Sequence, residues 1–497
     1  MDAALSDFAA ATLAAGTMPG LPDRLFIDGG WHPARSGRTM ASFDPGSGRP
    51  FLEFAAGGAE DVADAVAAAA RAQAGPWRDA KPAERGRILN RAAALLRVDA
   101  VRFAVAESLD CGKPVGEALG DVRGAARAFE YYAGAADKLE GASIPLGRDY
   151  LAFTVNEPVG VTAHVVPWNY PVSTTARSLA PALAAGCTAV VKPAEQTPVT
   201  ALMLAALLTD AGLPDGVVNV VTGTGAEAGA ALVADPRVRH ITFTGSGATG
   251  CRVMQAAAPN VTSLTLELGG KSPVVVLADC DMEAALAGVL GAIFENAGQI
   301  CSAGSRLVIE RSIHAEFVEK LVARTRALTL GHGLRNPQVG PLNSAAHLAK
   351  VAGYVDDART HGVEIVAGGR VTADPETGRG WFFEPTILDD VDAGDRVVQE
   401  EIFGPVLAVQ VVDGVEAALA AANGTPYGLV AGIYTRDIGK ALALARDIDA
   451  GQIYINEYFA GGIEVPFGGN KLSGFGREKG FRALDAYCKV KSVAARI

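Results

Sequence analysis

The feature that most constrains the fold is a regular alternation of short β-branched runs with alanine-rich segments. The run GVTAHVVP (160–167) precedes a segment that ends at Gly186, and TAVVKP (188–193) precedes a second such segment. The apolar runs have the length and composition of strands, and the segments between them have the length and end signals of helices. Strand–helix alternation at this rhythm indicates βαβ units on a parallel sheet, so the sequence predicts an α/β fold.

The alternation falls into two series. The first continues through GVVNVVTG (216–223) and VRHITFTG (238–245), and the second runs through PVVVLADCD (273–281) and SRLVIE (305–310). The segment LELGGKSP (266–273) lies between them and carries a glycine pair that suits a turn. We therefore expect two α/β domains in sequence, with a boundary near this segment.

Two further stretches fit neither series. Residues 141–160 and 487–497 alternate polar and apolar side chains as exposed strands do. An unpaired strand edge invites association with other chains unless something covers it. We expect the two stretches to pair with each other and with another subunit.

Charge and cysteine content argue against several functional classes. The chain has 44 basic and 55 acidic residues, a net charge of −11 and no long basic run, which argues against nucleic acid as a partner. Its six cysteines are far apart, without CxxC pairs or zinc-like spacing, so we expect a reduced, cytoplasmic protein without a metal site. The N-terminus has Asp2 and Asp7 where a signal peptide needs positive charge, and no apolar run approaches membrane-spanning length. We expect a frayed or helical arm there and no membrane partner.

A glycine motif follows the last strand of the first series. Gly245, Gly247 and Gly250 form the pattern GxGxxG, with a predicted strand before it and a predicted helix after it. Glycines let a backbone approach a pyrophosphate closely, and a helix N-terminus offers it free N–H groups. The motif predicts dinucleotide binding, and a glycine-rich turn without a ligand is the alternative.

Two positions compete for the ribose of such a dinucleotide. Glu267 lies 22 residues after Gly245, close to the spacing of the acid that holds a ribose. However, Glu267 also ends a β-run at the expected domain boundary, where its carboxylate would point into a cleft. Lys192 and Glu195 lie at the C-terminal end of a strand, where open α/β sheets bind ligands.

One cysteine, Cys301, has a distinctive setting. It lies in ENAGQICSAGSRL (295–307), among glycines, small residues and amides, whereas a cysteine kept for packing has apolar neighbours. The setting favours access to the sulfur and backbone donors around it. Because a thiol with a pKa of about 8.5 is mostly protonated at neutral pH, a reactive Cys301 needs a nearby base or a positive field.

Together these segments resemble the aldehyde dehydrogenase superfamily, in order and in approximate spacing, from about residue 160 to residue 480. The matching motifs are PWNYP (167–171), KPAE (192–195), FTGS (243–246), LELGGKSP (266–273), GQICS (298–302), EEIFGPV (400–406), NEYF (456–459) and PFGGNKLSGFGRE (466–478).

The resemblance implies a fold with three parts. A Rossmann-like NAD-binding domain would comprise residues 1–137 and 160–268, and an α/β catalytic domain would comprise residues 269–479. A small β oligomerisation element would comprise residues 138–159 and 480–497, and it would build a homotetramer or a homodimer. The two exposed-strand stretches fall where this element is expected.

The resemblance also implies the chemistry. Cys301 matches a nucleophile that attacks the aldehyde carbon, giving a thiohemiacetal and, after hydride transfer to NAD, a thioester that is hydrolysed to the acid. Glu267 matches the base that activates water, and Asn169 matches the donor that holds the oxyanion together with the Cys301 N–H. Two alternatives are a non-catalytic protein on the same fold and an enzyme that passes the thioester to coenzyme A. The three residues together argue against the first, and Glu267 argues against the second.

The cofactor implied by the resemblance is NAD. Lys192 and Glu195 would hold the adenosine ribose, and Glu401 would hold the nicotinamide ribose. A carboxylate at Glu195 repels a 2′-phosphate, which favours NAD over NADP. The residues implied to bind the cofactor are Trp168, Lys192, Glu195, Gly245, Ser246, Glu401 and Phe403.

Positions around the expected substrate tunnel leave the substrate open. Arg177 and Ser178 replace a Trp–Lys pair of many relatives, and Arg177 resembles the arginine with which succinic semialdehyde dehydrogenases hold a carboxylate. Those enzymes have a second arginine where this chain has Glu295, which suits a cationic substrate or pairs with Arg177. Glu464 resembles the acid of the E-x-P segment of betaine- and aminoaldehyde dehydrogenases.

Betaine- and aminoaldehyde dehydrogenases also hold ammonium groups against aromatic faces. The aromatic candidates in this chain are Tyr170, Phe294, Tyr458 and Phe459. The favoured substrate is therefore an amino- or betaine-type aldehyde, with a carboxylate semialdehyde and broader or aromatic aldehydes as alternatives.

Overall fold

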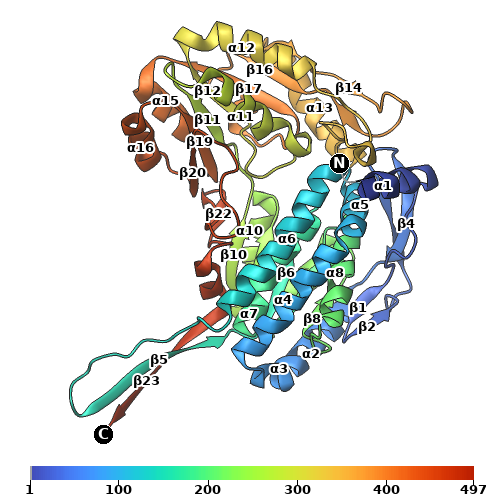
Figure 1. Ribbon diagram of the computed structural model, residues 1–497, viewed down its shortest axis with the longest axis vertical. Helices are drawn as coiled ribbons and strands as arrows, with labels where there is room; N and C mark the ends of the chain where they lie inside the picture. The colour runs from blue at the N-terminus through green and yellow to red at the C-terminus, as the bar shows by residue number, and fades with distance from the viewer. Residues whose placement is uncertain (1–2) are drawn as a thin grey trace.

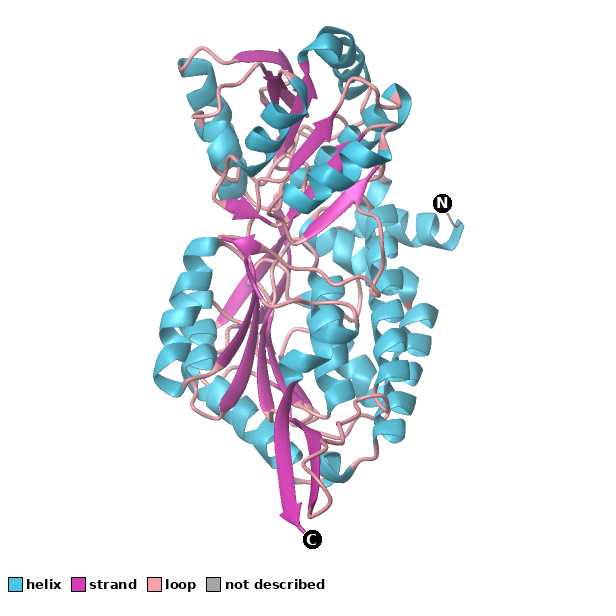
Figure 2. Ribbon diagram, turned by 90° about the vertical axis from the view of Figure 1, so that its left-hand side faces the viewer, coloured by secondary structure: helices cyan, strands magenta, loops and turns pink. Residues whose placement is uncertain are grey.

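The computed structural model describes residues 3–497, folded into two lobes with a two-stranded ribbon that projects from one of them (Figures 1 and 2). Each lobe is built on its own twisted sheet, and helices cover both. The predicted α/β fold with parallel sheets is confirmed. Among residues 3–497, no helix combines the length and the apolar character that crossing a membrane requires.

The first lobe contains an eight-stranded sheet in the order β2-β1-β8-β7-β6-β9-β10-β22. Strands β6 to β10 run parallel, whereas β1, β2 and β22 pair antiparallel at the edges. The strands are β1 (Leu25–Ile27), β2 (Gly30–His32), β6 (Val161–Val165), β7 (Thr188–Lys192), β8 (Val218–Val220), β9 (Val238–Thr244), β10 (Ser263–Glu267) and β22 (Gly474–Phe475).

Helices enclose this sheet on both faces, and the side chains of β7 show the two layers. Ala189 and Val191 pack into one core, and Val190 packs into the other. A strand buried on both faces reads as a continuous apolar run, which is why the sequence predicted it. The helices of this lobe are α2 (Ala59–Ala74), α3 (Pro76–Asp79), α4 (Pro82–Val98), α5 (Ala100–Cys111), α6 (Val115–Ala135), α7 (Pro171–Ala185), α8 (Val199–Asp210), α9 (Ala230–Ala234) and α10 (Gly247–Ala257).

The second lobe contains a seven-stranded sheet in the order β13-β16-β17-β12-β11-β19-β20. Only its edge strand β13 pairs antiparallel. The strands are β11 (Pro273–Val276), β12 (Arg306–Glu310), β13 (Glu364–Ala367), β16 (Thr386–Asp389), β17 (Val406–Val412), β19 (Val430–Tyr434) and β20 (Gln452–Ile455). The helices are α11 (Met282–Phe294), α12 (Arg311–Arg326), α13 (Ala345–Thr360), α14 (Arg396–Gln399), α15 (Gly414–Asn423) and α16 (Ile438–Asp447).

The chain returns from the second lobe to the first through β22. This short strand pairs with β10, so that Gly474 lies opposite Glu267 and Phe475 lies opposite Leu266. The sequence gave no sign of this pairing, because a two-residue strand carries no periodicity. Its consequence is that the segment after residue 466 lies beside the end of β10.

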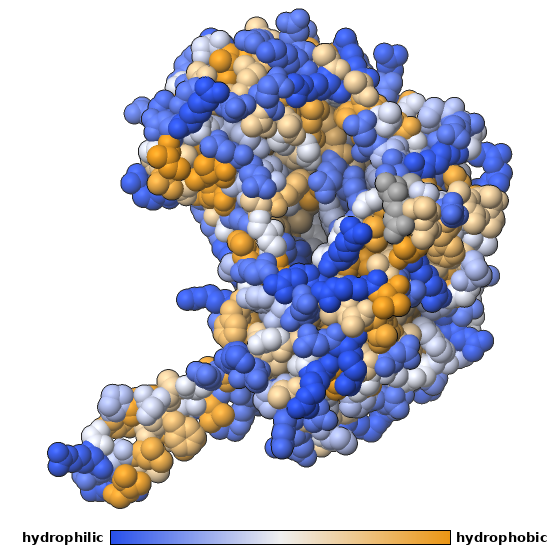
Figure 3. All heavy atoms as spheres, viewed as in Figure 1, coloured by the Kyte–Doolittle hydropathy of each residue, from blue (hydrophilic) through white to orange (hydrophobic). Residues whose placement is uncertain are grey.

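The ribbon consists of β5 (Tyr150–Pro158) and β23 (Cys488–Arg496), which pair antiparallel along their whole length. The expected pairing of these two stretches is therefore observed. Apolar side chains on the ribbon face solvent in the single chain, among them Leu151, Phe153 and Val490 (Figure 3). At the other end of the chain, α1 (Ala3–Ala15) forms the expected helical arm, while Met1 and Asp2 lie outside the described residues.

Candidate active site

The carboxyl ends of β6, β7, β9 and β10 meet at one edge of the first sheet. Their parallel register aligns Val165 with Lys192 and with Phe243, and Glu267 with Thr244. Segments that follow these ends therefore converge, as ligand-binding loops of open α/β sheets do. The convergence assembles several of the predicted residues from motifs that are far apart in sequence.

Cys301 reaches this edge from the second lobe through a tight turn after α11. The sequence from Met282 to Gly298 has one continuous helical pattern, but α11 ends at Phe294. Asn296 and Ala297 adopt left-handed backbone angles, with φ of 47° and 53°, and Gly298 has φ of 72°. A Cβ at Gly298 would lie 2.2 Å from the Gly404 carbonyl oxygen, so the turn requires glycine there. The turn redirects the chain toward the first lobe, which helix propensity alone does not reveal.

Two cavities open between the lobes, where the surface is hollowed in Figure 3, and Cys301 lines both. The aromatic cavity, of about 280 Å³, contains Tyr170, Tyr454, Phe459 and Phe467 in its wall. The glycine cavity, of about 200 Å³, contains Gly245, Ser246 and Gly269 in its wall. The residues common to both cavities are Pro167, Asn169, Thr244 and Cys301. The sulfur therefore belongs to a junction that two different molecules can approach from two sides.

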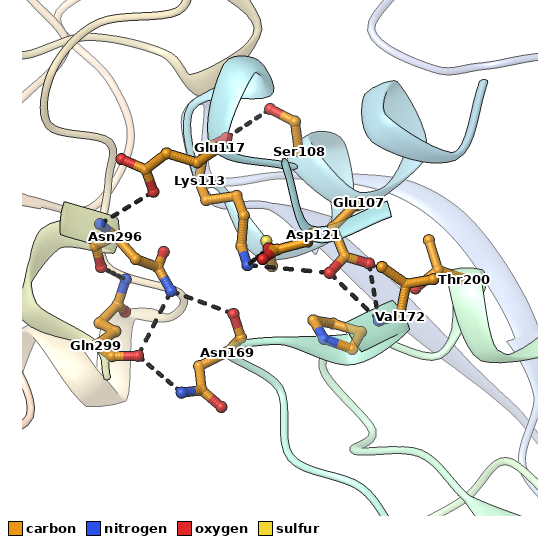
Figure 4. Close-up of polar contacts among 12 residues, drawn as sticks. Glu107, Ser108, Lys113, Glu117, Asp121, Asn169, Val172, Thr200, Asn296 and Gln299 are labelled. Atoms are coloured by element: carbon orange, nitrogen blue, oxygen red, sulfur yellow. Dashed lines mark hydrogen bonds and ion pairs between the residues drawn. The ribbon is translucent and has the colours of Figure 1, made fainter. Parts of the chain in front are cut away.

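The Asn169 amide is held in a fixed orientation beside this junction (Figure 4). Its Nδ2 donates to the Gln299 backbone carbonyl at 2.8 Å, and the Asn169 backbone carbonyl accepts from Asn296 Nδ2 at 3.2 Å. An amide nitrogen carries two hydrogens, so one N–H is used by Gln299 and the second is left for a ligand. A preoriented N–H next to a nucleophile is the geometry that an oxyanion requires.

Glu267 is buried at the end of β10 and lines the glycine cavity. Within residues 3–497, neither of its carboxylate oxygens makes a hydrogen bond. Burial, reinforced by the neighbouring Glu478, raises the pKa of Glu267 well above its usual range, and Arg177 opposes this rise. A buried carboxyl group with unused acceptor sites and a raised pKa is suited to taking a proton from a ligand or water.

The electrostatics of Cys301 are a balance between burial and a nearby cation. Burial raises the pKa of its thiol to about 11, with Glu267 and Glu401 pushing in the same direction, and Arg177 lowers it. One alternative from the sequence was an ion pair between Arg177 and Glu295. The structure corrects this, because the Arg177 side chain forms its ion pair with Glu478 instead.

The glycine cavity gathers most of the residues expected to bind a cofactor. The expected residues in its wall are Trp168, Gly245, Ser246, Glu401 and Phe403. Glu401 accepts a hydrogen bond from the Gly270 N–H at 2.9 Å, which fixes its carboxylate. Ser246 caps the N-terminus of α10, so the free N–H groups of that helix begin at the cavity.

Two expected cofactor residues lie outside that wall. Lys192 and Glu195 form an ion pair of 2.9 Å at the end of β7, the strand next to β6 in the sheet. Two unexpected residues, His347 and Lys350 of α13, do line the cavity, and the His347 ring contacts those of Trp168 and Phe403. No motif in the sequence pointed to α13.

The aromatic cavity contains four of the six expected substrate residues. Tyr170, Arg177, Glu295 and Phe459 lie in its wall. Phe294 is instead buried in the core of the second lobe, because it is the last residue of α11 before the left-handed turn. The further aromatic candidate Tyr458 is buried behind the wall, where its hydroxyl donates to the Ser302 carbonyl at 2.9 Å.

Glu464 lies on the surface, away from both cavities. Its half-exposed carboxylate pairs with Arg127 of α6. The segment that resembles E-x-P therefore places this acid outside the cavities, although Gly461 and Phe467 on either side of the segment line the aromatic cavity.

The aromatic cavity also holds acidic groups that no motif indicated. Asp121 of α6 lines the wall and pairs with the fully buried Lys113, whose ammonium lies 3.8 Å from the Tyr170 ring centroid. Burial raises the pKa of Glu295, and the nearby Asp121 adds to this rise. Behind them, burial together with Glu295 raises the pKa of Glu117 to about 8. This acidic group of Glu117, Asp121 and Glu295 is hereafter the acidic rim.

Comparison with known proteins identifies a family that matches nearly the whole chain. The family model described as "Aldehyde dehydrogenase family" matches residues 31–493. Betaine aldehyde dehydrogenase of Bacillus subtilis is 42% identical over 473 residues, which cover 94% of this chain and 96% of that protein. Hydroxyisobutyraldehyde dehydrogenase of Mycolicibacterium austroafricanum is also 42% identical, over 97% of this chain and 95% of that protein.

A solved structure gives the same result at the level of the fold. The indole-3-acetaldehyde dehydrogenase of P. syringae, a mutant form in complex with NAD+ and IAA, superposes with a TM-score of 0.96 at 38% identity. The match covers 99% of both chains. These relatives carry three different substrates in their names at similar identity, so overall similarity does not select among them.

Proposed function

Since the chain belongs to the aldehyde dehydrogenase family, and is thus an NAD-dependent oxidoreductase acting on aldehydes, we propose that it oxidises an amino- or betaine-type aldehyde through Cys301. The observation that carries the proposal is the position of Cys301 in the walls of both cavities. In this assignment, the aromatic cavity receives the aldehyde and the glycine cavity receives the nicotinamide end of NAD.

The residues of the glycine cavity fit a dinucleotide. Gly245 and Gly269 lie in its wall, and a backbone without side chains lets a pyrophosphate approach closely. Ser246 and the helix N-terminus suit a pyrophosphate, and the fixed Glu401 carboxylate suits a ribose hydroxyl. Lys192 and Glu195, at the end of the adjacent strand, are assigned to the second ribose. NAD, when bound, supplies the hydride acceptor.

The chain's own residues carry the remaining chemistry. The Cys301 sulfur bonds to the aldehyde carbon, and the resulting oxyanion is held by the free N–H of Asn169 and the Cys301 backbone N–H. Departure of a hydride from that carbon leaves a thioester on Cys301. Glu267 then takes a proton from a water molecule as the water oxygen bonds to the thioester carbon. The carbon–sulfur bond breaks, and the acid and the thiolate are released.

The acidic rim supports an ammonium-bearing substrate. The Glu295 carboxylate lines the cavity and makes no ion pair or hydrogen bond within the described part of the chain, so it is available to a ligand. Tyr170 and Phe459 line the same cavity and offer aromatic faces to a cation. Arg177, the residue that would favour a substrate carboxylate, pairs through Nε with Glu478, which offsets part of its charge.

We assign the ribbon to subunit association and retain the division into three parts that the sequence suggested. The ribbon of β5 and β23 exposes large apolar side chains along its length, and a partner subunit would cover them. A homotetramer or homodimer follows from this assignment, and sedimentation of the purified chain distinguishes them from a monomer.

Two variants test the proposal with a panel of betaine aldehyde, 4-aminobutyraldehyde, succinic semialdehyde and benzaldehyde. Cys301→Ala should abolish formation of reduced NAD while NAD binding persists. Glu295→Gln should raise KM for the cationic aldehydes about tenfold, the worth of one charged contact, and leave KM for benzaldehyde unchanged. Glu464→Gln is the matched control, because this acid lies outside the cavity. Turnover by the Cys301 variant would refute the nucleophile, and equal effects of Glu295→Gln on all four aldehydes would refute the substrate class.

A further inference from the structure

We propose that Arg177 and Lys479 together supply the positive field that stabilises the Cys301 thiolate in this protein. The inference rests on the assignment of Cys301 as the nucleophile. It goes further by naming what ionises a sulfur that is otherwise surrounded by carboxylates and apolar side chains. Neither Arg177 nor Lys479 lies in a sequence motif that indicates this role.

Arg177 lies in the middle of α7, with its side chain 13% exposed, and shares the aromatic cavity with Cys301. Its Nε faces the buried Glu478 in an ion pair, and its guanidinium carbon lies 5.4 Å from the Phe467 ring centroid. One edge of the guanidinium is thus neutralised by Glu478, and the rest remains available to the cavity.

Lys479 adds a second cation to the same cavity. It follows Glu478 in sequence, lines the cavity wall, and places its ammonium 5.3 Å from the same Phe467 ring. No residue that the structure describes forms an ion pair or a hydrogen bond with it. Burial lowers the pKa of Lys479 to about 8, with Arg177 pushing in the same direction, so the ammonium is charged below that pH.

The remaining groups around the sulfur do not favour its ionisation. Glu267 and Glu401 both oppose the thiolate, and Arg177 is the strongest group that lowers the pKa of Cys301. Three tyrosines whose pKa values are raised by burial also face the sulfur and stay uncharged at neutral pH: Tyr170, Tyr454 and Tyr458.

The ionisation itself is a simple equilibrium. The S–H bond of Cys301 breaks, the electron pair stays on sulfur, and the proton passes to solvent. Two cations in a partly desolvated cavity favour the anion, since charges interact more strongly there than in water. The competing explanation is a purely structural role for Arg177 as the counterion of Glu478. The two explanations predict opposite changes in the alkylation rate when Glu478 is replaced.

The test measures alkylation of Cys301 by iodoacetamide from pH 6 to pH 10, without aldehyde or NAD. All variants are made in a Glu267→Gln background, because Glu267 would otherwise change its ionisation when Glu478 is replaced. A parallel Cys301→Ala series corrects for the other cysteines, of which Cys251 is exposed.

Removal of an opposite charge shifts a pKa by about 1 to 3 units. Because a more basic thiolate is also intrinsically more reactive, the alkylation rate at neutral pH should fall by about 3-fold to about 45-fold. Arg177→Met and Lys479→Met should both show this loss, and Arg177→Lys should keep most of the wild-type rate. Glu478→Gln should accelerate alkylation, because it frees the Arg177 charge. Lys440→Met, on an exposed helix, is the control and should change nothing.

A structural role predicts instead that Arg177→Met and Glu478→Gln both slow alkylation, since either one breaks the buried pair. That result would overturn the proposal, as would an unchanged rate in Arg177→Met. If Arg177→Met does not fold, Lys479→Met is the deciding variant, because it breaks no ion pair. An unchanged alkylation rate in Lys479→Met would then refute the proposal that a positive field ionises Cys301. The assay needs no turnover, so its failure is distinct from failure of the proposed reaction.

Discussion

Replacement of Glu267 by glutamine should separate the two halves of the proposed reaction. Glutamine keeps the shape of the side chain at the end of β10 but cannot accept a proton from water. A general base in this position contributes about 100-fold to about 10,000-fold to the rate of its step. Because both Glu267 oxygens are free of protein hydrogen bonds within residues 3–497, the change breaks no internal contact, and the loss should fall on thioester hydrolysis.

The structure predicts the direction in which steady-state turnover changes with pH. The raised pKa of Glu267 means that its carboxylate, the form that acts as a base, becomes populated only as the pH rises above the usual range of a glutamate. In the native chain, steady-state turnover should therefore rise with pH through that raised pKa. In Glu267→Gln, this rise should disappear, although the separate dependence on the Cys301 thiolate remains.

Stopped-flow absorbance of reduced NAD measures both halves in one experiment. The variant should give a burst approaching one reduced cofactor per subunit, followed by steady-state turnover slower by about 100-fold or more. Glu319→Gln, an exposed acid on α12, is the matched control and should behave as the native chain does. A steady-state rate within about threefold of the native value would show that Glu267 is not the base for hydrolysis. If the burst were lost together with the steady-state rate, Glu267 would act at a step before hydrolysis.

Two further substitutions follow from contacts at the junction. Asn169→Ala should lower kcat by about 100-fold to about 1,000-fold with NAD affinity retained, because it removes the N–H that Gln299 orients; a loss below about tenfold in steady-state assays would contradict the oxyanion role. Gly269→Ala should weaken NAD binding in a fluorescence titration, because the new Cβ would lie 2.2 Å from a Glu401 oxygen, whereas Gly247→Ala meets no atom within 4 Å and should bind NAD normally.

The parts of the fold that the sequence predicted are those whose cause is local. Buried parallel strands such as β7 are continuous apolar runs, and helices such as α7 end at a glycine that adopts a left-handed conformation, as Gly186 does with φ of 94°. Cys301 stood out because its neighbours are small and polar, which is also a local property. These signals need no knowledge of the rest of the chain.

The parts that could not be predicted depend on contacts between distant segments. The left-handed turn at Asn296 overrides a helical pattern because the chain must return toward the first lobe. The partner of Arg177 is Glu478, which lies beside it only because β22 joins the first sheet. Asp121 reaches the aromatic cavity from a helix that carries no motif, and Lys113 is paired with it inside the protein. Such placements are properties of the tertiary structure, and a single sequence does not encode them in any one segment.

The aromatic cavity separates charge in a way that fixes how a substrate can lie in it. The charged groups that act on Glu295 are Asp121 and Lys113, whereas those that act on Lys479 are Arg177, Glu478, Cys301 and Glu267. Asp121, paired with Lys113 beside the Tyr170 ring, and the two cations beside the Phe467 ring lie at different parts of the cavity wall. Arg177, one of these cations, lowers the pKa of the Cys301 thiol. Under the proposed substrate class, an aldehyde with a distal ammonium group would place that group at the rim and its carbonyl at Cys301, where the developing oxyanion meets positive charge. An aldehyde with a distal carboxylate is attracted in the reverse orientation, which places its carbonyl away from the sulfur. In the proposed function, the same arrangement of charges favours both ionisation of the nucleophile and an aldehyde whose distal group is cationic.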